Sequence, residues 1–258
     1  MCLLVFAHQA VPDEPLIFAG NRDEFYDRPT APAQAWDDAP HVIAGRDRRA
    51  GGTWMGVTRR GHWAVVTNVR APDAYRDDAR SRGELVATYL REEPAPRPYL
   101  DDVAARADQY NPFNLLVGTP GTLDYCFSRA PAVRAIEPGV HGLSNDRLNT
   151  PWPKVQRARS AFREHMEAGA PSTEALLDLL DDRRPAPDEA LPDTGLDRDR
   201  ERMLSPIFIE GDRYGTRAST VLRIAGDGTV TFVERTFEDG VPVDTRRFSF
   251  TAPVDAPT

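Results

Sequence analysis

The chain has few cysteines and no pattern that would pair them. Among its 258 residues only Cys2 and Cys126 are cysteines, and they form no CxxC motif. Neither a disulfide framework nor a redox dithiol is therefore expected. Cys126 stands in a strand-like run and is expected to be buried as a small apolar residue. Such sparse use of cysteine is typical of a cytoplasmic protein.

Several other signals are missing. The five histidines are scattered without ligand spacing, so no metal site is predicted. No apolar stretch approaches the roughly 18 residues of a membrane span, and the apolar run at the amino terminus is too short for a signal peptide. The net charge of −8 argues against nucleic-acid binding. Arginine supplies almost all positive charge, Lys154 being the single lysine, and this bias indicates base composition more than function.

What is present is the composition of an ordinary globular protein, with 40% hydrophobic and 28% charged residues. The length fits one large domain, expected over residues 1–252. Residues 183–202 are rich in Pro, Asp and Arg and are predicted to form an exposed loop. Residues 253–258 are expected to be a frayed tail.

Strand and helix signals alternate in blocks along the chain. Strands are predicted at Cys2–His8, Leu16–Gly20, Thr53–Thr58, His62–Thr67, Asn114–Gly118, Thr122–Phe127, Pro206–Glu210, Thr216–Ile224, Thr229–Thr236 and Val241–Phe250. Helices are predicted after a capping box formed by Ser81 and Glu84, and at Tyr99–Tyr110, 152–168 and 173–182. Helices grouped between blocks of antiparallel hairpins favour a layered α+β fold.

Cys2 is the first candidate for chemistry. A small second residue normally allows the initiator methionine to be removed, which would leave Cys2 with a thiol and a free α-amine on one carbon. Their reference pKa values, about 8.5 and about 7.7–8.0, let both groups titrate near neutrality. An α-amine can accept the proton of its own residue's nucleophile. The alternative is a small apolar residue that opens a buried strand.

Other polar residues could complete a site around Cys2. Arg22 would favour a thiolate and Asp23 could orient the amine, although charges at a strand end also pair with one another at the surface. Asn68 and Asn145 could donate to an oxyanion or serve a turn. Arg217 could bind a carboxylate or simply be solvated. Asn21 and Trp54, in the same motifs, are candidates for substrate binding.

Taken together these segments resemble the NRDE family, also called the transport and Golgi organisation 2 family. The resemblance covers nearly the whole chain and is carried by Met1-Cys2, Asn21-Arg22-Asp23-Glu24-Phe25-Tyr26-Asp27-Arg28-Pro29, Gly51-Gly52-Thr53-Trp54, Val66-Thr67-Asn68, Leu143-Ser144-Asn145 and Gly215-Thr216-Arg217-Ala218-Ser219-Thr220. The family is similar in turn to the N-terminal nucleophile hydrolases of the bile salt hydrolase and penicillin V acylase branch. The resemblance implies a four-layer αββα sandwich of two stacked antiparallel sheets.

The resemblance also implies roles for single residues. Cys2 matches the nucleophile, Asn68 the oxyanion-hole position, Asn145 the later asparagine that completes or supports that hole, and Arg217 an arginine near the thiol. The chain departs from the hydrolases at Arg22 and Asp23. These residues are adjacent here, whereas their counterparts stand three residues apart, and neighbours in a strand face opposite ways. At least one of the two roles must therefore be reassigned.

Two functions follow from the resemblance and stay open at this point. The first is an amidohydrolase that cleaves a linear C–N bond of an acylated small molecule with Cys2 as nucleophile and without a required cofactor. The second is a non-enzymatic protein that binds or traffics haem or an acyl lipid in the Cys2 pocket, with thiolate as a haem ligand. A scaffold with a dead site is a weaker third. The sequence does not determine the oligomeric state.

Overall fold

Antiparallel hairpins assemble into two stacked β-sheets in the computed structural model, which describes residues 2–167 and 169–253. The six-stranded sheet has the order β10 (Gly139–Leu143), β1 (Cys2–Val11), β2 (Glu14–Phe25), β11 (Tyr214–Ile224), β12 (Thr229–Glu238) and β13 (Val241–Thr251). The seven-stranded sheet has the order β3 (Thr30–Trp36), β4 (Ala39–Asp47), β5 (Met55–Thr58), β6 (Trp63–Asn68), β7 (Phe113–Gly118), β8 (Leu123–Phe127) and β9 (Val133–Ala135).

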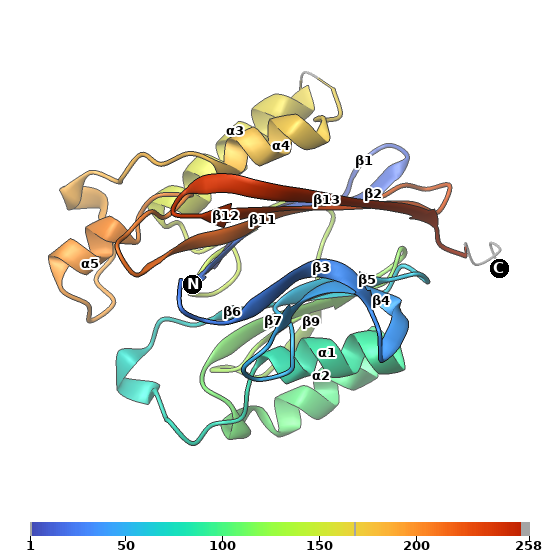
Figure 1. The fold of residues 1–258 in the computed structure, drawn as a ribbon, viewed down its shortest axis with the longest axis horizontal. Coiled ribbons are helices and arrows are strands. Elements are labelled where there is room, and N and C mark those ends of the chain that lie inside the picture. The colour runs from blue at the N-terminus through green and yellow to red at the C-terminus, as the bar shows by residue number, and fades with distance from the viewer. Residues whose placement is uncertain (1, 168, 254–258) are drawn as a thin grey trace.

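Helices cover the outer face of each sheet (Figure 1). The seven-stranded sheet is covered by α1 (Gly83–Glu92) and α2 (Pro96–Ala105), and the six-stranded sheet by α3 (Pro153–Glu167) and α4 (Thr173–Leu180). A shorter helix, α5 (Arg198–Met203), lies beside the layers, and 3₁₀ turns occupy Pro72–Ala74, Ala107–Gln109 and Asp188–Ala190. No helix among residues 2–167 and 169–253 is long and apolar enough to cross a membrane.

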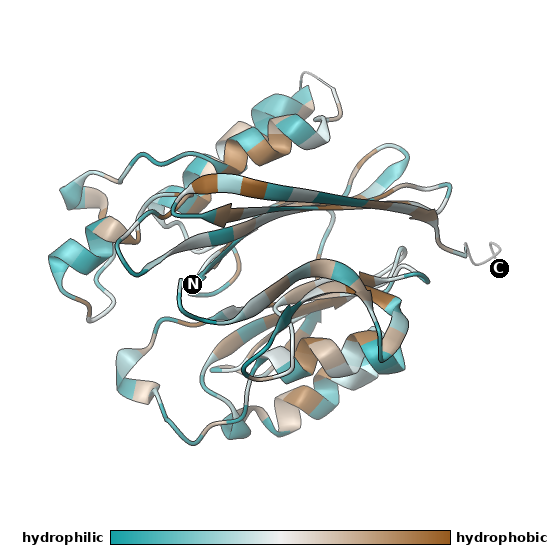
Figure 2. Ribbon diagram, in the orientation of Figure 1, coloured by the Kyte–Doolittle hydropathy of each residue, from teal (hydrophilic) through white to brown (hydrophobic). Residues whose placement is uncertain are grey.

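The strand β1 explains how an uninterrupted apolar run fits between two layers. Leu4 and Phe6 belong to the core between the sheets, whereas Leu3 and Val5 pack against the helix layer of α3 and α4. Because side chains alternate along a strand, a central strand covered on both faces must be apolar at every position. Figure 2 shows the complementary pattern, with hydrophobic and hydrophilic residues on the same helices. The amino-terminal run is thus a core strand that begins at Cys2.

The αββα architecture confirms the predicted fold class, and most of the predicted elements are present. The hairpin between β12 and β13 turns at Asp239 and Gly240, whose φ angles of 48° and 74° are those that an Asp-Gly turn requires. Cys126 is buried, as expected. Three predictions were wrong or incomplete. The strands β3, β4, β9 and β10 were not predicted, Pro206–Glu210 forms no strand, and α1 is preceded by Arg82 rather than by a capping Ser81.

The prediction of an exposed loop over 183–202 was also wrong in part. This segment contains a 3₁₀ turn and most of α5, and its Glu201 is buried against Arg70 in an ion pair. The guanidinium of Arg70 also lies 4.8 Å from the ring centroid of Trp152. The segment is therefore fastened to the sandwich by a buried charge pair. The predicted frayed tail falls mainly on 254–258, outside the described residues.

Candidate functional site

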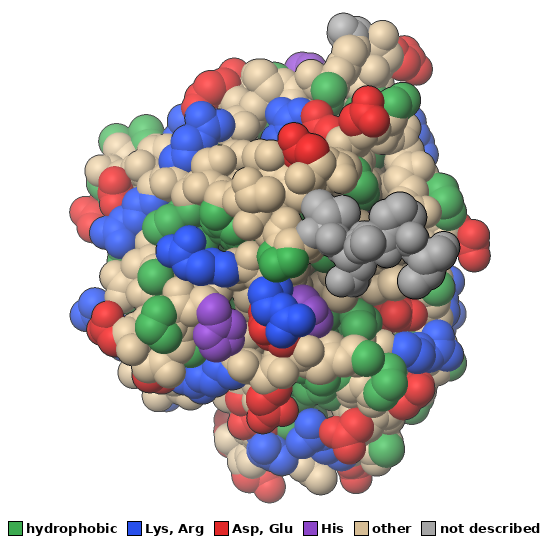
Figure 3. Space-filling view, turned by 90° about the vertical axis from the view of Figure 1, so that its right-hand side faces the viewer, with side chains coloured by type: hydrophobic (Ala, Val, Ile, Leu, Met, Phe, Trp, Pro, Cys, Tyr) green, Lys and Arg blue, Asp and Glu red, His purple; other side chains and the backbone are tan. Residues whose placement is uncertain are grey.

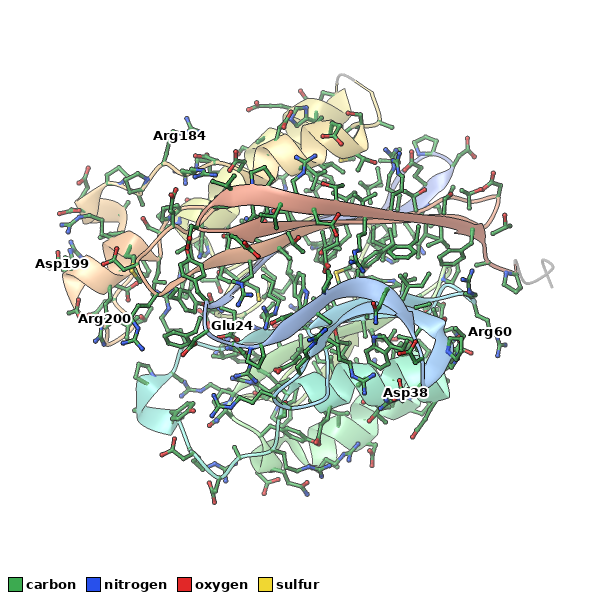
Figure 4. All side chains as sticks on the ribbon, in the orientation of Figure 1. Glu24, Asp38, Arg60, Arg184, Asp199 and Arg200 are labelled. Carbon is green, nitrogen blue, oxygen red and sulfur yellow. The ribbon has the colours of Figure 1, made fainter. Side chains whose placement is uncertain are left out.

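Cys2 stands where β1 reaches a cavity between the two sheets. The cavity has a volume of about 690 Å³ and is lined by residues of both sheets and of the segment that leads into α1. In the ladder between β1 and β2, Cys2 pairs with Arg22, so both side chains project from the same face of the sheet. Glu24, from the same strand as Arg22, lies in the space between the sheets (Figure 4).

The environment of the Cys2 thiol favours its protonated form. The residue is only 7% exposed, and burial raises the pKa of the thiol above its ordinary value. A backbone hydrogen bond from Asp23 and the charge of Arg22 act in the opposite direction without reversing the shift. The strand end is held by Ser144, whose hydroxyl donates to the Cys2 carbonyl at 3.0 Å. A protonated thiol of this kind needs a base before it can attack a carbonyl.

Arg22 and Asp23 face opposite sides of the sheet. Arg22 shares the face of Cys2, and its Nη2 lies 3.7 Å from a carboxylate oxygen of Glu24. Asp23 accepts a hydrogen bond of 2.8 Å from the Thr216 hydroxyl, and burial raises the pKa of its carboxyl. Asp23 also forms part of the cavity wall. The geometry therefore places a guanidinium beside the thiol and the carboxyl group behind it.

The two predicted oxyanion asparagines occupy different positions. Asn68 ends β6 and lines the cavity. Asn145 is buried behind it, where its Nδ2 donates to the main-chain oxygen of Asn68 at 2.9 Å. Its Oδ1 lies 3.1 Å from the Ser144 hydroxyl, whose single proton is shared between this oxygen and the Cys2 carbonyl. Of the two asparagines, Asn68 is thus the one that lines the cavity. Asn145 holds the end of β6 in place.

Arg217 and Trp54 both line the cavity. Arg217 lies at an irregularity in the pairing of β11 with β2. Its Nη1 donates to the main-chain oxygens of Phe25, Tyr26 and Arg28 at 2.9, 3.1 and 3.1 Å. The guanidinium therefore secures the turn that follows β2, while Trp54 supplies an aromatic surface on the opposite sheet.

The assignment of Asn21 to substrate binding is corrected. Asn21 is fully buried, and its Nδ2 donates to the carbonyl oxygens of Leu180 and Ile207, both at 2.9 Å. Its Oδ1 accepts from the Ser219 hydroxyl at 2.6 Å. As an odd-numbered residue of β2 it faces the helix layer, so its amide connects that layer to the sheet and does not face the cavity.

Lys154 is a polar residue near the site that the sequence-based assignment overlooked. It is 2% exposed at the start of α3, and its Nζ donates to the Leu204 carbonyl at 2.9 Å. Burial lowers the pKa of its ammonium group to about 8, against the opposing charges of Asp23 and Cys2. A cation in the first turn of a helix is also disfavoured by the helix dipole. One feature of the sequence could have indicated Lys154, because it is the chain's single lysine. The scarcity of lysine was attributed to base composition instead.

The cavity wall is rich in charge of both signs. Its arginines are Arg22, Arg28, Arg46, Arg49, Arg76, Arg80, Arg82 and Arg217, and its acidic residues are Asp23, Glu24, Asp47, Asp77, Glu234, Glu238 and Asp244. The eight arginines outnumber the seven acidic residues, and burial raises the pKa of the Asp23 and Glu234 carboxyls. The balance of charged residues on the cavity wall is therefore more positive than that of the whole protein, whose net charge is −8. On the side of the molecule drawn in Figure 3, acidic and basic side chains are interspersed.

Comparison with known families places this geometry in context. Residues 1–239 match the model of the family described as Transport and Golgi organisation 2. The bovine transport and Golgi organization protein 2 homologue is 36% identical, covering 91% of this chain and 92% of its own length. The human homologue is 34% identical over 97% and 99% of the two chains. The protein of the same name from Drosophila melanogaster is 28% identical over 92% of each.

Two solved structures align over most of the chain. The N-acylethanolamine-hydrolyzing acid amidase ortholog of Caenorhabditis elegans has a TM-score of 0.47 and 11% identity, with 86% of this chain and 92% of that chain covered. A mutant of the conjugated bile acid hydrolase of Clostridium perfringens has a TM-score of 0.48 and 7% identity, with 99% and 100% covered.

Proposed function

The chain belongs to the transport and Golgi organisation 2 family, and from this premise we propose that it is an amidohydrolase whose nucleophile is Cys2. One observation carries the proposal. Cys2 reaches the cavity between the sheets, with Arg22 opposite it in the ladder and Asn68 on the wall of the other sheet. The substrate is an acylated small molecule with a linear C–N amide bond.

The proposed reaction has two steps. The α-amine of Cys2, freed by removal of Met1, takes the thiol proton as Sγ attacks the amide carbonyl carbon. The Asn68 amide donates to the oxyanion, the C–N bond breaks, and the proton passes to the leaving amine to give a thioester on Cys2. The same α-amine then deprotonates a water molecule, which attacks the thioester carbon. The acyl group leaves as a carboxylic acid and the thiol recovers its proton.

Several contacts support this assignment of roles. Burial raises the pKa of the Cys2 thiol, so the nucleophile depends on a nearby base. Arg22, on the same face, stabilises the thiolate as it forms. Asn145 fixes the end of β6 through the main-chain oxygen of Asn68, and Ser144 fixes the end of β1 through the Cys2 carbonyl. The adjacent residues Ser144 and Asn145 thus hold the strand ends that carry the nucleophile and the oxyanion donor.

The cavity does not fit haem well. Sites for large apolar ligands are lined mainly by hydrophobic and aromatic side chains, whereas fifteen of the lining residues are arginine, aspartate or glutamate. The raised pKa of the buried Cys2 thiol also disfavours the thiolate that would bind iron. The alternative of haem or acyl-lipid trafficking is therefore the weaker proposal.

The first experiment determines the intact mass of the natively expressed chain and then measures turnover of acyl amides. We expect Met1 to be absent, a thioester adduct on Cys2 during turnover, and a loss of at least about a thousandfold in Cys2→Ala. An amino-terminally extended form keeps the thiol but lacks the free amine, and it should be equally inactive. Retention of Met1 in an active enzyme would reject the proposed base.

Haem titration tests the alternative directly. Wild type and Cys2→Ser are titrated with haem and followed by absorption spectroscopy. The amidohydrolase proposal expects no thiolate-type band that depends on Cys2. A band present in wild type and lost in Cys2→Ser, together with no turnover of any acyl amide, would favour haem binding instead.

A further inference from the structure

Arg82 is a cation of the cavity that forms no ion pair with a carboxylate among the described residues. It directly precedes α1 and lines the cavity. Its Nη1 donates to the main-chain oxygen of Pro112 at 3.1 Å, and no ion pair joins it to a carboxylate within residues 2–167 and 169–253. Burial lowers the pKa of the guanidinium, and Tyr75, Glu24 and Cys2 are the groups that oppose this shift. Arg82 and Cys2 thus both lie on the wall of this cavity. A desolvated cation without an anion is costly.

Arg22 presents a second unsatisfied donor from the opposite sheet. The residue is 7% exposed, and its buried Nη1 has no hydrogen-bond partner among the described atoms. Its Nη2 lies 3.7 Å from Glu24, which is longer than a hydrogen bond. Since a buried polar group without a partner is uncommon in a folded protein, this nitrogen marks a place where a ligand atom can bind.

Building on the proposed hydrolysis, we propose that Arg82 and Arg22 bind the carboxylate of an N-acyl amino acid. A guanidinium presents a planar fork of donors that matches a carboxylate. Arg22 is the direct ladder partner of Cys2, so an anion bound there lies close to the thiol. In an acylated amino acid the carboxylate is one carbon away from the amide nitrogen, which brings the scissile carbonyl to Cys2. The acyl chain extends along the wall that contains Trp54.

The test separates binding from turnover by using Cys2→Ala. Calorimetry compares N-octanoylglycine with N-octanoylglycinamide, in which an uncharged carboxamide replaces the carboxylate. We expect the carboxylate to bind about tenfold to a hundredfold more tightly. Arg82→Gln in the same background should abolish the difference and Arg82→Lys should restore part of it. The matched control is Arg97→Gln, because Arg97 does not line the cavity, pairs with Asp101 at 3.6 Å and should leave the difference unchanged.

Each outcome decides one of two questions. Equal binding of the two ligands, or a preference that survives Arg82→Gln in a protein with an unchanged melting temperature, would overturn the carboxylate site. Tighter Arg82-dependent binding of N-octanoyl phosphoethanolamine than of N-octanoylglycine would assign the site to phosphate instead. If the carboxylate preference holds but wild type turns over neither ligand, the site stands and the hydrolase proposal fails.

Discussion

Replacing Lys154 by methionine should change how the stability of the protein depends on pH. The side chain is buried, and its Nζ has one hydrogen bond, to the Leu204 carbonyl at 2.9 Å. Burial lowers the pKa of the ammonium group from 10.5 to about 8. Methionine has a similar length and no charge, so Lys154→Met removes the titration and leaves most of the packing.

The magnitude follows from the pKa difference between the folded and unfolded chains. Below pH 8 both states hold the proton, and the wild type carries a constant penalty relative to the variant. Between pH 8 and pH 10.5 the unfolded chain binds one more proton than the folded one, so the stability of the wild type rises with pH. At 1.36 kcal/mol per pKa unit, the free energy of unfolding of wild type minus variant should rise by about 3 kcal/mol across this window.

Urea unfolding at several pH values between 7 and 11 measures the difference in the free energy of unfolding between wild type and variant. Titrations that occur in both proteins cancel in this difference. Arg163→Met, an exposed position on the same helix, is the control and should give a flat difference because a guanidinium stays protonated. A difference for Lys154→Met that stays constant within about 1 kcal/mol would refute the argument. Lys154 would then keep an ordinary pKa despite its burial.

Three further substitutions test other parts of the structure. Glu201→Gln removes the carboxylate charge that is paired with the buried Arg70 guanidinium and should lower the free energy of unfolding by about 3–5 kcal/mol in urea titrations, and the double replacement Arg70→Met with Glu201→Leu should recover most of this loss. Gly52→Ala places a Cβ 2.4 Å from the main chain at the start of α1, so it should lower the free energy of unfolding by about 1–3 kcal/mol and weaken carboxylate binding. In Gly121→Ala the new Cβ meets no described atom within 4 Å, so neither stability nor binding should change. Asn21→Ala removes the donor to two buried carbonyls, so it should lower the melting temperature without changing the KM of the folded enzyme. A raised KM would instead support a role of Asn21 in substrate binding.

The strands that could be predicted from sequence carry local signals. The β5–β6 hairpin has a three-residue link with Gly61 at a φ of 80°, and the hairpins of the carboxyl-terminal block turn at Asp-Gly pairs. The strands β3 and β4 lack such a signal, because their runs are short, rich in alanine and interrupted by proline. They become strands by pairing with each other and with β5. Tertiary pairing here overrides weak propensity.

The site shows the same division. Cys2, Arg22 and Asn68 could be proposed because each stands in a motif at the end of a strand-like run. Arg82 could not, because it is one arginine among many, and only the structure reveals that it lines the cavity and that no carboxylate of the described part of the chain pairs with it. For Asn21 the register decided the matter, since a shift of one residue along β2 moves a side chain from the cavity to the helix layer.

By itself, the sequence determined the order of the strand and helix blocks, the α+β class and the position of the thiol at the start of a core strand, because periodicity, turn residues and apolar runs are local properties. Only the tertiary structure decided which polar residues share a cavity, which of Arg22 and Asp23 lies beside Cys2, and which charges are left without partners. Burial and charge pairing depend on residues that are distant in the chain, and folding alone brings them together.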